Sequence, residues 1–331
     1  MSDVEELRNM LDGAFDKERF HAILAKYVDM VPWLVIDLPM SYPIYRGREM
    51  KGDDLLYVDK RELSYPPAEY APMGRVSYAH HPMFYGSVLP GDKSGGQLPW
   101  VTIVEELEVF KGADGRRDLT FSIWERWRQL RLAALPFSSK YKGKVADEIA
   151  NIQKEWEEKV KPHMTKAEVE IATFFSDLLV QPGSEKLYQF TAGFFEFFLN
   201  HSEEGRELDG VAYLSAPSEG KGLNICLKPE SADLLRLENA AYVIFYKTGD
   251  ELCRIVYLEA DAKTKPLKWS VNVHNGGNRL PEPMRSRFMK DDARFKSDVK
   301  VAVYNRGRTK LVKRKENNVM GVKRNHIIHN T

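Results

Sequence analysis

The spacing of apolar residues separates the chain into helical and strand-rich parts. Apolar side chains recur at intervals of three and four over residues 4–11 and 16–28, which predicts two short helices near the start. The same spacing returns over residues 145–202, where TKAE at residues 165–168 has the spacing of a capping box and predicts a helix start. We expect the first two helices to cap a central sheet and residues 145–202 to form a helical insertion.

Strands are predicted on both sides of this helical stretch, because short runs of β-branched and aromatic residues alternate there with turn residues. The runs are WLVIDLP (33–39), IYRGRE (44–49), PMFY (82–85), DLTFSIWERWRQLRLAALPF (118–137), GVAYLSAP (210–217), LNICLKP (223–229), AAYVIFYKTG (240–249) and CRIVYLEAD (253–261). A short helix is predicted over residues 98–110, where proline stands at the first helical position. The sequence therefore predicts an α+β fold, with a central sheet interrupted by a helical insertion.

The order of the predicted helices and strands divides the chain into three segments. Residues 1–40 form an N-terminal helical cap, residues 41–270 form the main domain, and residues 271–331 form a C-terminal extension. The extension ends in a basic tail whose apolar residues have little periodicity. The helical insertion lies inside the main domain, at about residues 145–202.

Composition narrows the class of protein. The chain has 331 residues, and 43% of them are hydrophobic, which is enough for a sizeable core. Its 49 basic and 48 acidic residues nearly cancel, so no global field favours nucleic acid or an anionic membrane. The start of the chain is acidic, and the longest purely apolar run, residues 240–245, is too short to span a bilayer. We therefore expect a cytoplasmic protein that does not contact membranes.

Cysteine and histidine give no sign of a metal centre. The two cysteines, Cys226 and Cys253, form no C-x-x-C pattern and are expected to be buried residues of strands. His80 and His81 are adjacent in the sequence, so they are poorly placed to bind one ion from an extended segment. No metal site is predicted.

A pair of arginines supplies the first candidate site. Residues i and i+2 of a strand point to the same side, so Arg46 and Arg48 of IYRGRE would present two guanidinium groups together. A guanidinium group binds phosphate or carboxylate oxygens in pairs, which makes this Arg-x-Arg a candidate phosphate clamp. Two exposed arginines at a sheet edge are the alternative.

Arg75, after Gly74 in GRVS, and Tyr85, at the end of PMFY, are further candidates for the site.

Two further segments carry candidate groups for chemistry. Glu105 and Glu106 lie in the mostly apolar stretch WVTIVEELEVF, where one of them can point to solvent and the other toward a cleft; a solvated helix face is the alternative. Ser215 follows an apolar strand at a turn and can donate a hydrogen bond to a ligand, although serine is also a common turn residue. GKG at residues 220–222 lacks the third glycine of a dinucleotide-binding loop, and the chain has no G-x-S-x-G.

The candidate segments follow one another along the chain in the order arginine, tyrosine, glutamate and serine. Taken together, they resemble the RES domain family, which is named for its arginine, glutamate and serine. The resemblance covers residues 43–261 and rests on YRGR, GRVS, MFY, the Thr102-to-Glu106 spacing, GVAYLS and GLN. The counterparts of the family residues are Arg46, Arg75, Tyr85, Glu106, Ser215 and Asn224. If the alignment with the family motif is shifted by one residue, Glu105 becomes the counterpart of the family glutamate instead of Glu106. Ser77 departs from the family, which usually has asparagine at that position.

The resemblance implies an ADP-ribosyltransferase-like sheet and an enzyme that consumes NAD as a substrate, with no separate cofactor. Members of the family include toxins that are paired with a helical Xre-type antitoxin. By resemblance, Arg46, Arg48 and Arg75 would bind the pyrophosphate of NAD. Tyr85 would contact the nicotinamide or the ribose, Ser215 would bind the ribose or the carboxamide, and Asn224 would be a further NAD-binding residue. Glu106 would face the positive charge that develops on the ribose as nicotinamide leaves. The acceptor could be phosphate, water or a protein side chain.

Two other readings remain open at this stage. Residues 306–315 contain six basic side chains, with Tyr304 nearby, and could follow the phosphates of a nucleic acid; a solvated tail is the alternative. Alternatively, the chain could be a non-catalytic interaction protein with a RES-like fold, in which the helical insertion supplies the partner surface.

Overall fold

The computed structural model contains helices and a mostly antiparallel sheet, and it divides into two compact units. It describes residues 2–27, 34–40, 42–50, 56–57, 59–88, 103, 107, 110, 114–135, 138, 140, 147–181, 183–215, 222–249 and 251–271. The first unit consists of Met1–Tyr45, Ser64–Glu106 and Glu125–Arg236, and the second of Arg46–Leu63, Leu107–Trp124 and Leu237–Thr331. Each unit is therefore assembled from segments that are distant in the sequence.

Most of the described helices lie in the first unit. They are α1 (Asp3–Asp12), α2 (Lys17–Leu24), α4 (Asp147–Glu155), α5 (Lys166–Leu179), α6 (Glu185–His201), α7 (Glu203–Glu207), α8 (Pro229–Ala232) and the short turns η1 (Lys60–Leu63, in the second unit), η2 (Ala68–Tyr70), η4 (Trp156–Val160) and η5 (Lys161–His163). The predicted helical character of the two segments near the start and of residues 145–202 is confirmed for the described residues. The helix predicted over residues 98–110 falls largely outside the described residues.

Ten strands are described. They are β1 (Leu34–Leu38), β2 (Ile44–Glu49), β3 (Phe84–Val88), β4 (Gly115–Glu125), β5 (Leu130–Leu135), β6 (Gly210–Leu214), β7 (Leu223–Leu227), β8 (Arg236–Thr248), β9 (Glu251–Asp261) and β10 (Lys268–Val271). In the first unit the strand order is β1-β5-β6-β7-β3-β2, and in the second it is β2-β4-β8-β9-β10. Strand β2 contributes its first two residues to the first unit and the rest to the second.

The α+β prediction is confirmed at this level. The pairings β1–β5, β6–β7, β3–β7, β2–β3, β8–β9 and β9–β10 are antiparallel, whereas β5 and β6 are parallel. The parallel pair needs a long crossover connection, and the helical insertion lies in that connection. The strand pattern predicted over residues 118–137 is two strands, β4 and β5, with a turn at residues 126–129 between them.

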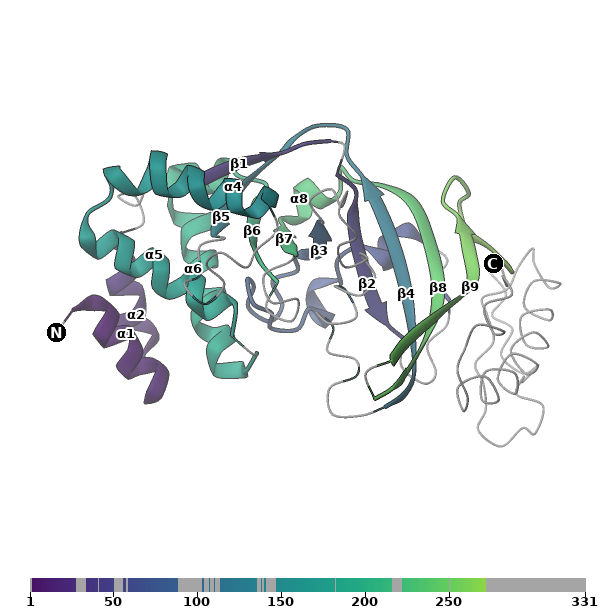
Figure 1. Ribbon diagram of the computed structural model, residues 1–331, viewed down its shortest axis with the longest axis horizontal. Helices are drawn as coiled ribbons and strands as arrows, with labels where there is room; N and C mark the ends of the chain where they lie inside the picture. Colours follow the sequence, from purple (N-terminus) through teal and green to yellow (C-terminus); the bar gives the residue numbers. More distant parts are fainter. Residues whose placement is uncertain are drawn as a thin grey trace. The chain divides into compact units, whose positions relative to one another are not determined.

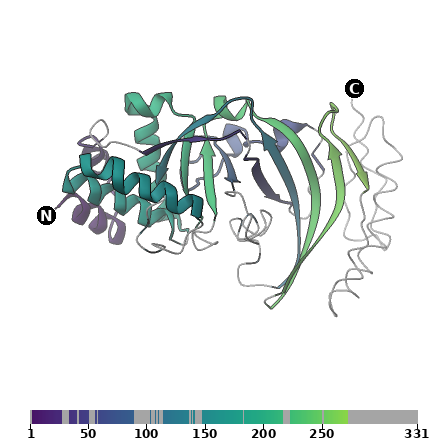
Figure 2. The same cartoon turned by 45° about the horizontal axis from the view of Figure 1, so that its top comes forward.

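Aromatic side chains fill the core of the first unit. Helices α1, α2, α5 and α6 and strands β5, β6 and β7 all contribute buried apolar side chains to one cluster. Phe20 of α2 packs edge-on against Phe175 of α5 and Phe190 of α6, and Phe175 stacks on Phe194 with the ring centres 3.8 Å apart. Figure 1 shows these four helices as one group, and Figure 2 shows the same purple and teal helices together after a 45° turn.

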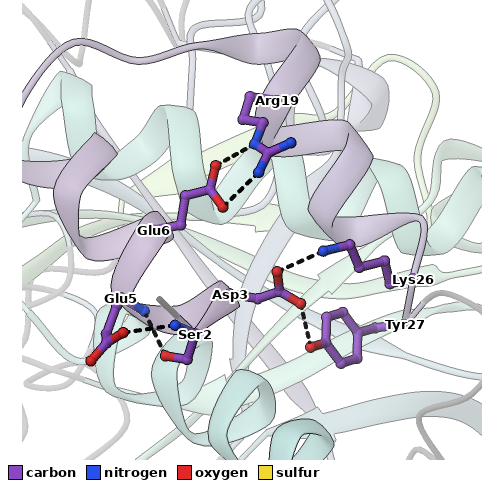
Figure 3. Close-up of polar contacts among 7 residues, drawn as sticks. All are labelled: Ser2, Asp3, Glu5, Glu6, Arg19, Lys26 and Tyr27. Carbon is purple, nitrogen blue, oxygen red and sulfur yellow. Dashed lines mark hydrogen bonds and ion pairs between the residues drawn. The ribbon is translucent and has the colours of Figure 1, made fainter.

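Capping and ion pairs fix the N-terminal helix pair. Ser2 accepts a hydrogen bond from the Glu5 backbone N–H, and the Glu5 side chain accepts one from the Ser2 backbone, which completes a capping box. Asp3 of α1 accepts hydrogen bonds from Lys26 and Tyr27, each at 2.7 Å, beyond the end of α2 (Figure 3). The capping box predicted at residues 165–168 is also present, with Thr165 and Glu168 as its two members.

None of the helices among the described residues has both the length and the apolar character needed to cross a bilayer. The basic tail, together with all residues after Val271, lies outside the described part of the chain.

Candidate functional site

Three of the residues selected from the sequence lie on one face of neighbouring strands in the first unit. In the antiparallel pairs, Tyr85 of β3 lies opposite Cys226 of β7, and Ser87 lies opposite Asn224. Asn224 in turn lies opposite Tyr213 of β6. Directly opposed residues share a face, and so do residues two apart on a strand. Tyr85 and Asn224 therefore face the same side of the sheet.

Ser215 extends this face at the end of β6. It comes two residues after Tyr213, and its backbone N–H donates to the carbonyl oxygen of Gly222 at 3.0 Å, which continues the β6–β7 ladder by one step. The side chain of Ser215 is completely buried. Asn224 is also buried, and its Oδ1 accepts a hydrogen bond from the Ser87 hydroxyl at 2.7 Å. Ser87 was not selected from the sequence, and only the pairing of β3 with β7 reveals it.

Tyr85 is held in place by its hydroxyl group. The oxygen accepts a hydrogen bond from the Val76 backbone N–H at 3.0 Å and lies 3.0 Å from the Ser77 hydroxyl. Burial raises the pKa of Tyr85 well above its ordinary value of 10.0, while the hydrogen bonds with Ser77 and Val76 act in the opposite direction. Tyr85 is therefore a neutral phenol whose ring position is fixed by the loop before β3.

Arg75 belongs to the same loop, and its charge faces the end of a helix. The side chain is buried, and Nη1 donates a hydrogen bond to the Leu179 carbonyl oxygen at 2.9 Å. Leu179 is the last residue of α5, where the helix dipole and the terminal carbonyls favour a cation. The guanidinium group also lies over the Tyr188 ring, 5.5 Å from its centre. Arg75 thus connects the loop before β3 to the helical insertion.

Arg46 and Arg48 lie on β2, in the part of the strand that belongs to the second unit. They share one side of β2, as predicted, and Tyr45 points to the other side. Tyr45 belongs to the first unit and pairs with Ser87 of β3. Arg48 donates to the Glu62 carbonyl oxygen at 2.6 Å and lies over the Tyr57 ring.

The two candidate glutamates, Glu105 and Glu106, lie outside the described residues. Of the cysteines, Cys226 is buried in β7 as predicted, whereas the Cys253 side chain is not described. Within the described ranges, no three His, Cys, Asp or Glu side chains are grouped closely enough to bind a metal ion.

An open pocket of about 620 Å³ lies at the opposite end of β3 and β7 from Ser87. Its lining comes from the loop before β3, the end of α6, α7 and the start of α8, namely Val76, Ser77, His80, His81, Pro82, Met83, Glu196, Leu199, Asn200, Arg206, Lys228, Pro229 and Glu230. His80 and His81, which are adjacent in the sequence and gave no metal site there, both line this pocket. No local pattern connects them to Glu196, because the contact depends on how α6 packs.

In comparisons with models of known protein families, with curated proteins and with solved structures, no match to this chain was found. The described structure therefore defines an α+β protein with two candidate sites in its first unit.

Proposed function

We propose that the chain binds NAD and cleaves the bond between nicotinamide and ribose. The observation that supports this most is the common face of Tyr85, Asn224 and Ser215 on three adjacent strands, since the RES resemblance assigns all three to NAD, with Tyr85 and Ser215 at its nicotinamide riboside half. An aromatic ring, an amide and a hydroxyl suit a ligand that carries an aromatic carboxamide and sugar hydroxyls.

The proposed reaction breaks the C–N bond of the nicotinamide riboside. Nicotinamide leaves as a neutral molecule with the electron pair of that bond, and positive charge develops on the ribose. The carboxylate of Glu106, or of Glu105, stabilises this charge and binds a ribose hydroxyl. An oxygen of water or phosphate then bonds to the ribose carbon and loses its proton. Transfer to a protein side chain follows the same course.

Arginines are proposed to bind the pyrophosphate. The guanidinium group of Arg75 has five N–H donors, and one of them donates to the Leu179 carbonyl oxygen. A pyrophosphate would accept hydrogen bonds from the other N–H groups. Arg46 and Arg48 face the other side of β2 from Tyr45, so their part in binding is a separate element of the proposal and needs its own test. The RES resemblance would further make the protein a cytoplasmic toxin with a helical Xre-type antitoxin as its partner.

The direct experiment is incubation of the purified chain with NAD, with and without phosphate, and chromatographic analysis of the products. We expect release of nicotinamide, together with ADP-ribose or its 1-phosphate. Glu106→Gln should slow the release by about 100-fold or more, by analogy with loss of one transition-state contact. Glu207→Gln is the matched control, because the Glu207 side chain is 76% exposed at the end of α7.

Three results would count against the enzyme. The first is no release of nicotinamide by the wild-type chain, and the second is an unchanged rate in both Glu105→Gln and Glu106→Gln. The third is full activity of Ser215→Ala and Asn224→Ala, provided that both variants are folded by circular dichroism. Absence of NAD binding in calorimetry at millimolar ligand, together with a stable complex with a partner protein, would indicate the non-catalytic interaction protein instead.

A further inference from the structure

The pocket between the loop before β3 and the ends of α6, α7 and β7 has a different chemical character from the face of Tyr85 and Asn224. Its volume of about 620 Å³ falls within the range of about 300–1,000 Å³ that is typical of small-molecule sites. Pro82, Met83, Leu199 and Pro229 form apolar parts of the wall. Its polar part comprises the imidazole and basic side chains of His80, His81, Arg206 and Lys228, the carboxylates of Glu196 and Glu230, and Ser77 and Asn200.

His81 is held by a fixed carboxylate. Its Nδ1 lies 2.6 Å from Oε1 of Glu196, and the same oxygen accepts a hydrogen bond from the Tyr78 backbone N–H at 3.1 Å. The Glu196 side chain is only 18% exposed, whereas the imidazole of His81 is 61% exposed. The Glu196 carboxylate accepts the proton of Nδ1, which fixes the ring orientation, so the exposed Nε2 accepts a hydrogen bond when the ring is neutral and donates one when the ring is protonated.

His80 is placed beside His81 by an unusual backbone conformation. Its φ of 68° is in the left-handed region, and Nδ1 lies 3.2 Å from the Ala68 carbonyl oxygen. The His80 backbone N–H donates to the Ala71 carbonyl oxygen at 2.9 Å. These contacts fix a second imidazole in the lining of the pocket.

Lys228 and Arg206 supply permanent positive charge. Nζ of Lys228 donates to the carbonyl oxygens of Gly205 and Arg206 at 2.9 and 3.0 Å, near the end of α7. An ammonium group has three donors, and these carbonyls use two of them. Burial lowers the pKa of Lys228, whereas Glu230 and Asp209 act in the opposite direction, so a bound anion would recover solvation that the ammonium group has lost. The Arg206 side chain is exposed beside it.

We propose that this pocket binds a small phosphomonoester, with Arg206, Lys228 and His81 around the phosphate and the apolar wall against the rest of the molecule. A phosphate group has several acceptor oxygens and can bond to donors from more than one side. A carboxylate has two oxygens in one plane and matches this set of donors less well. Two carboxylates also line the pocket. Glu196 accepts hydrogen bonds from His81 and from the Tyr78 backbone N–H, and the charge of Glu230 acts on Lys228.

The site does not depend on the NAD proposal. Its residues lie at the other end of β3 and β7 from Ser87 and Asn224, and binding is measured without any turnover. Phenyl phosphate is a suitable probe because it combines a phosphate with an apolar ring, and benzoate serves as the carboxylate comparison.

Isothermal titration calorimetry of the full chain tests the proposal. We expect phenyl phosphate to bind at least about tenfold more tightly than benzoate, and Arg206→Gln and His81→Gln each to weaken phenyl phosphate by about tenfold, the loss of one charged hydrogen bond. Arg8→Gln, on the exposed side of α1, is the matched control and should bind like the wild type.

The proposal is overturned by any of three outcomes. Phenyl phosphate shows no binding at millimolar concentration, benzoate binds as tightly, or Arg206→Gln and His81→Gln bind like Arg8→Gln. Both test residues are exposed at the pocket, so circular dichroism should show that the variants remain folded.

Discussion

Arg128 and Asp209 form a two-contact ion pair that joins the turn before β5 to the start of β6. Nη1 and Nη2 of Arg128 lie 2.8 and 2.5 Å from the two carboxylate oxygens. The Asp209 side chain is only 6% exposed, whereas that of Arg128 is 48% exposed. Asp209 also accepts hydrogen bonds from the Arg131 backbone N–H at 2.8 Å and the Ser231 hydroxyl at 2.6 Å. One carboxylate therefore connects three segments of the first unit.

Asp209→Asn should destabilise the fold. The amide keeps the size of the side chain but removes the charge that these donors face, so the free energy of unfolding should fall by about 1.5–3 kcal/mol. Urea unfolding followed by circular dichroism measures this. Glu207→Gln is the control, because its carboxylate lies 3.8 Å from Arg131 and is largely exposed, and its effect should stay within about 0.5 kcal/mol. Equal effects of the two changes would contradict the role of Asp209.

The contribution of Asp209 should also depend on pH. Burial raises the pKa of Asp209, but hydrogen bonds from Arg128, Ser231 and the Arg131 N–H outweigh this and hold it below its ordinary value of 3.8. The unfolded chain thus binds the proton more readily, and the stabilisation present above about pH 3.8 is lost as the pH falls through the folded-state pKa. The difference in unfolding free energy between wild type and Asp209→Asn should shrink from about pH 6 to about pH 3. A constant difference would be the contrary result.

Tyr27 should control part of the stability at alkaline pH. Burial and the hydrogen bond to Asp3 raise its pKa from 10.0 to about 12 (Figure 3). A raised folded-state pKa means that the stabilisation is complete below about pH 10 and is lost as the pH rises toward 12. As the pH rises from about 10 to 12, the free energy of unfolding of Tyr27→Phe should therefore fall less than that of the wild type. Tyr70→Phe, which changes a side chain that is 73% exposed, should behave like the wild type.

Gly210 should not tolerate a side chain. A Cβ at this position would lie 2.0 Å from the Cys226 carbonyl oxygen and 2.9 Å from its carbonyl carbon, both in the backbone of β7. Gly210→Ala should therefore lower the unfolding free energy by about 1–3 kcal/mol through overpacking. Gly249→Asn is the control, because φ there is +56°, a value that asparagine adopts, and no atom lies within 4 Å. An unchanged midpoint of urea unfolding for Gly210→Ala would show that β6 and β7 are not this close.

Thr165 should contribute to the start of α5. Its hydroxyl accepts a hydrogen bond from the Glu168 N–H at 3.3 Å, and the Glu168 side chain accepts one from the Thr165 N–H. Thr165→Ala should lower the unfolding free energy by about 1 kcal/mol, whereas Thr165→Ser keeps the accepting oxygen and should retain most of it. The two variants are compared by thermal unfolding, and equal melting temperatures would exclude a capping role.

Local features were predictable because they depend on neighbouring residues. The helical insertion follows from the three-and-four spacing of its apolar residues, and the start of α5 follows from the capping box at Thr165. Strand β2 spans the predicted IYRGRE, since alternation and β-propensity operate within a few residues. The sequence predicted one strand pattern over residues 118–137 and did not indicate the turn at residues 126–129. In that turn Arg128 donates to Asp209, which is distant in the sequence.

The candidate sites depended much more on tertiary contacts. The resemblance supplied Tyr85, Ser215 and Asn224, but only the register of β3, β7 and β6 shows that they share a face. The register also brings in Ser87, which no motif indicated. Arg75, chosen as a phosphate ligand, donates to the end of α5, a contact that requires the helical insertion to be packed in place.

The sequence by itself determined the α+β class and most of the described helices and strands, although not β10, because periodicity, capping and turn chemistry act over a few residues. Only the tertiary structure decided which strands are neighbours, which face Tyr85 and Asn224 share, and that His81 meets Glu196 beside Lys228. Such contacts join residues that are far apart along the chain. They are fixed by the packing of whole elements around the buried aromatic core, and no local pattern encodes that packing.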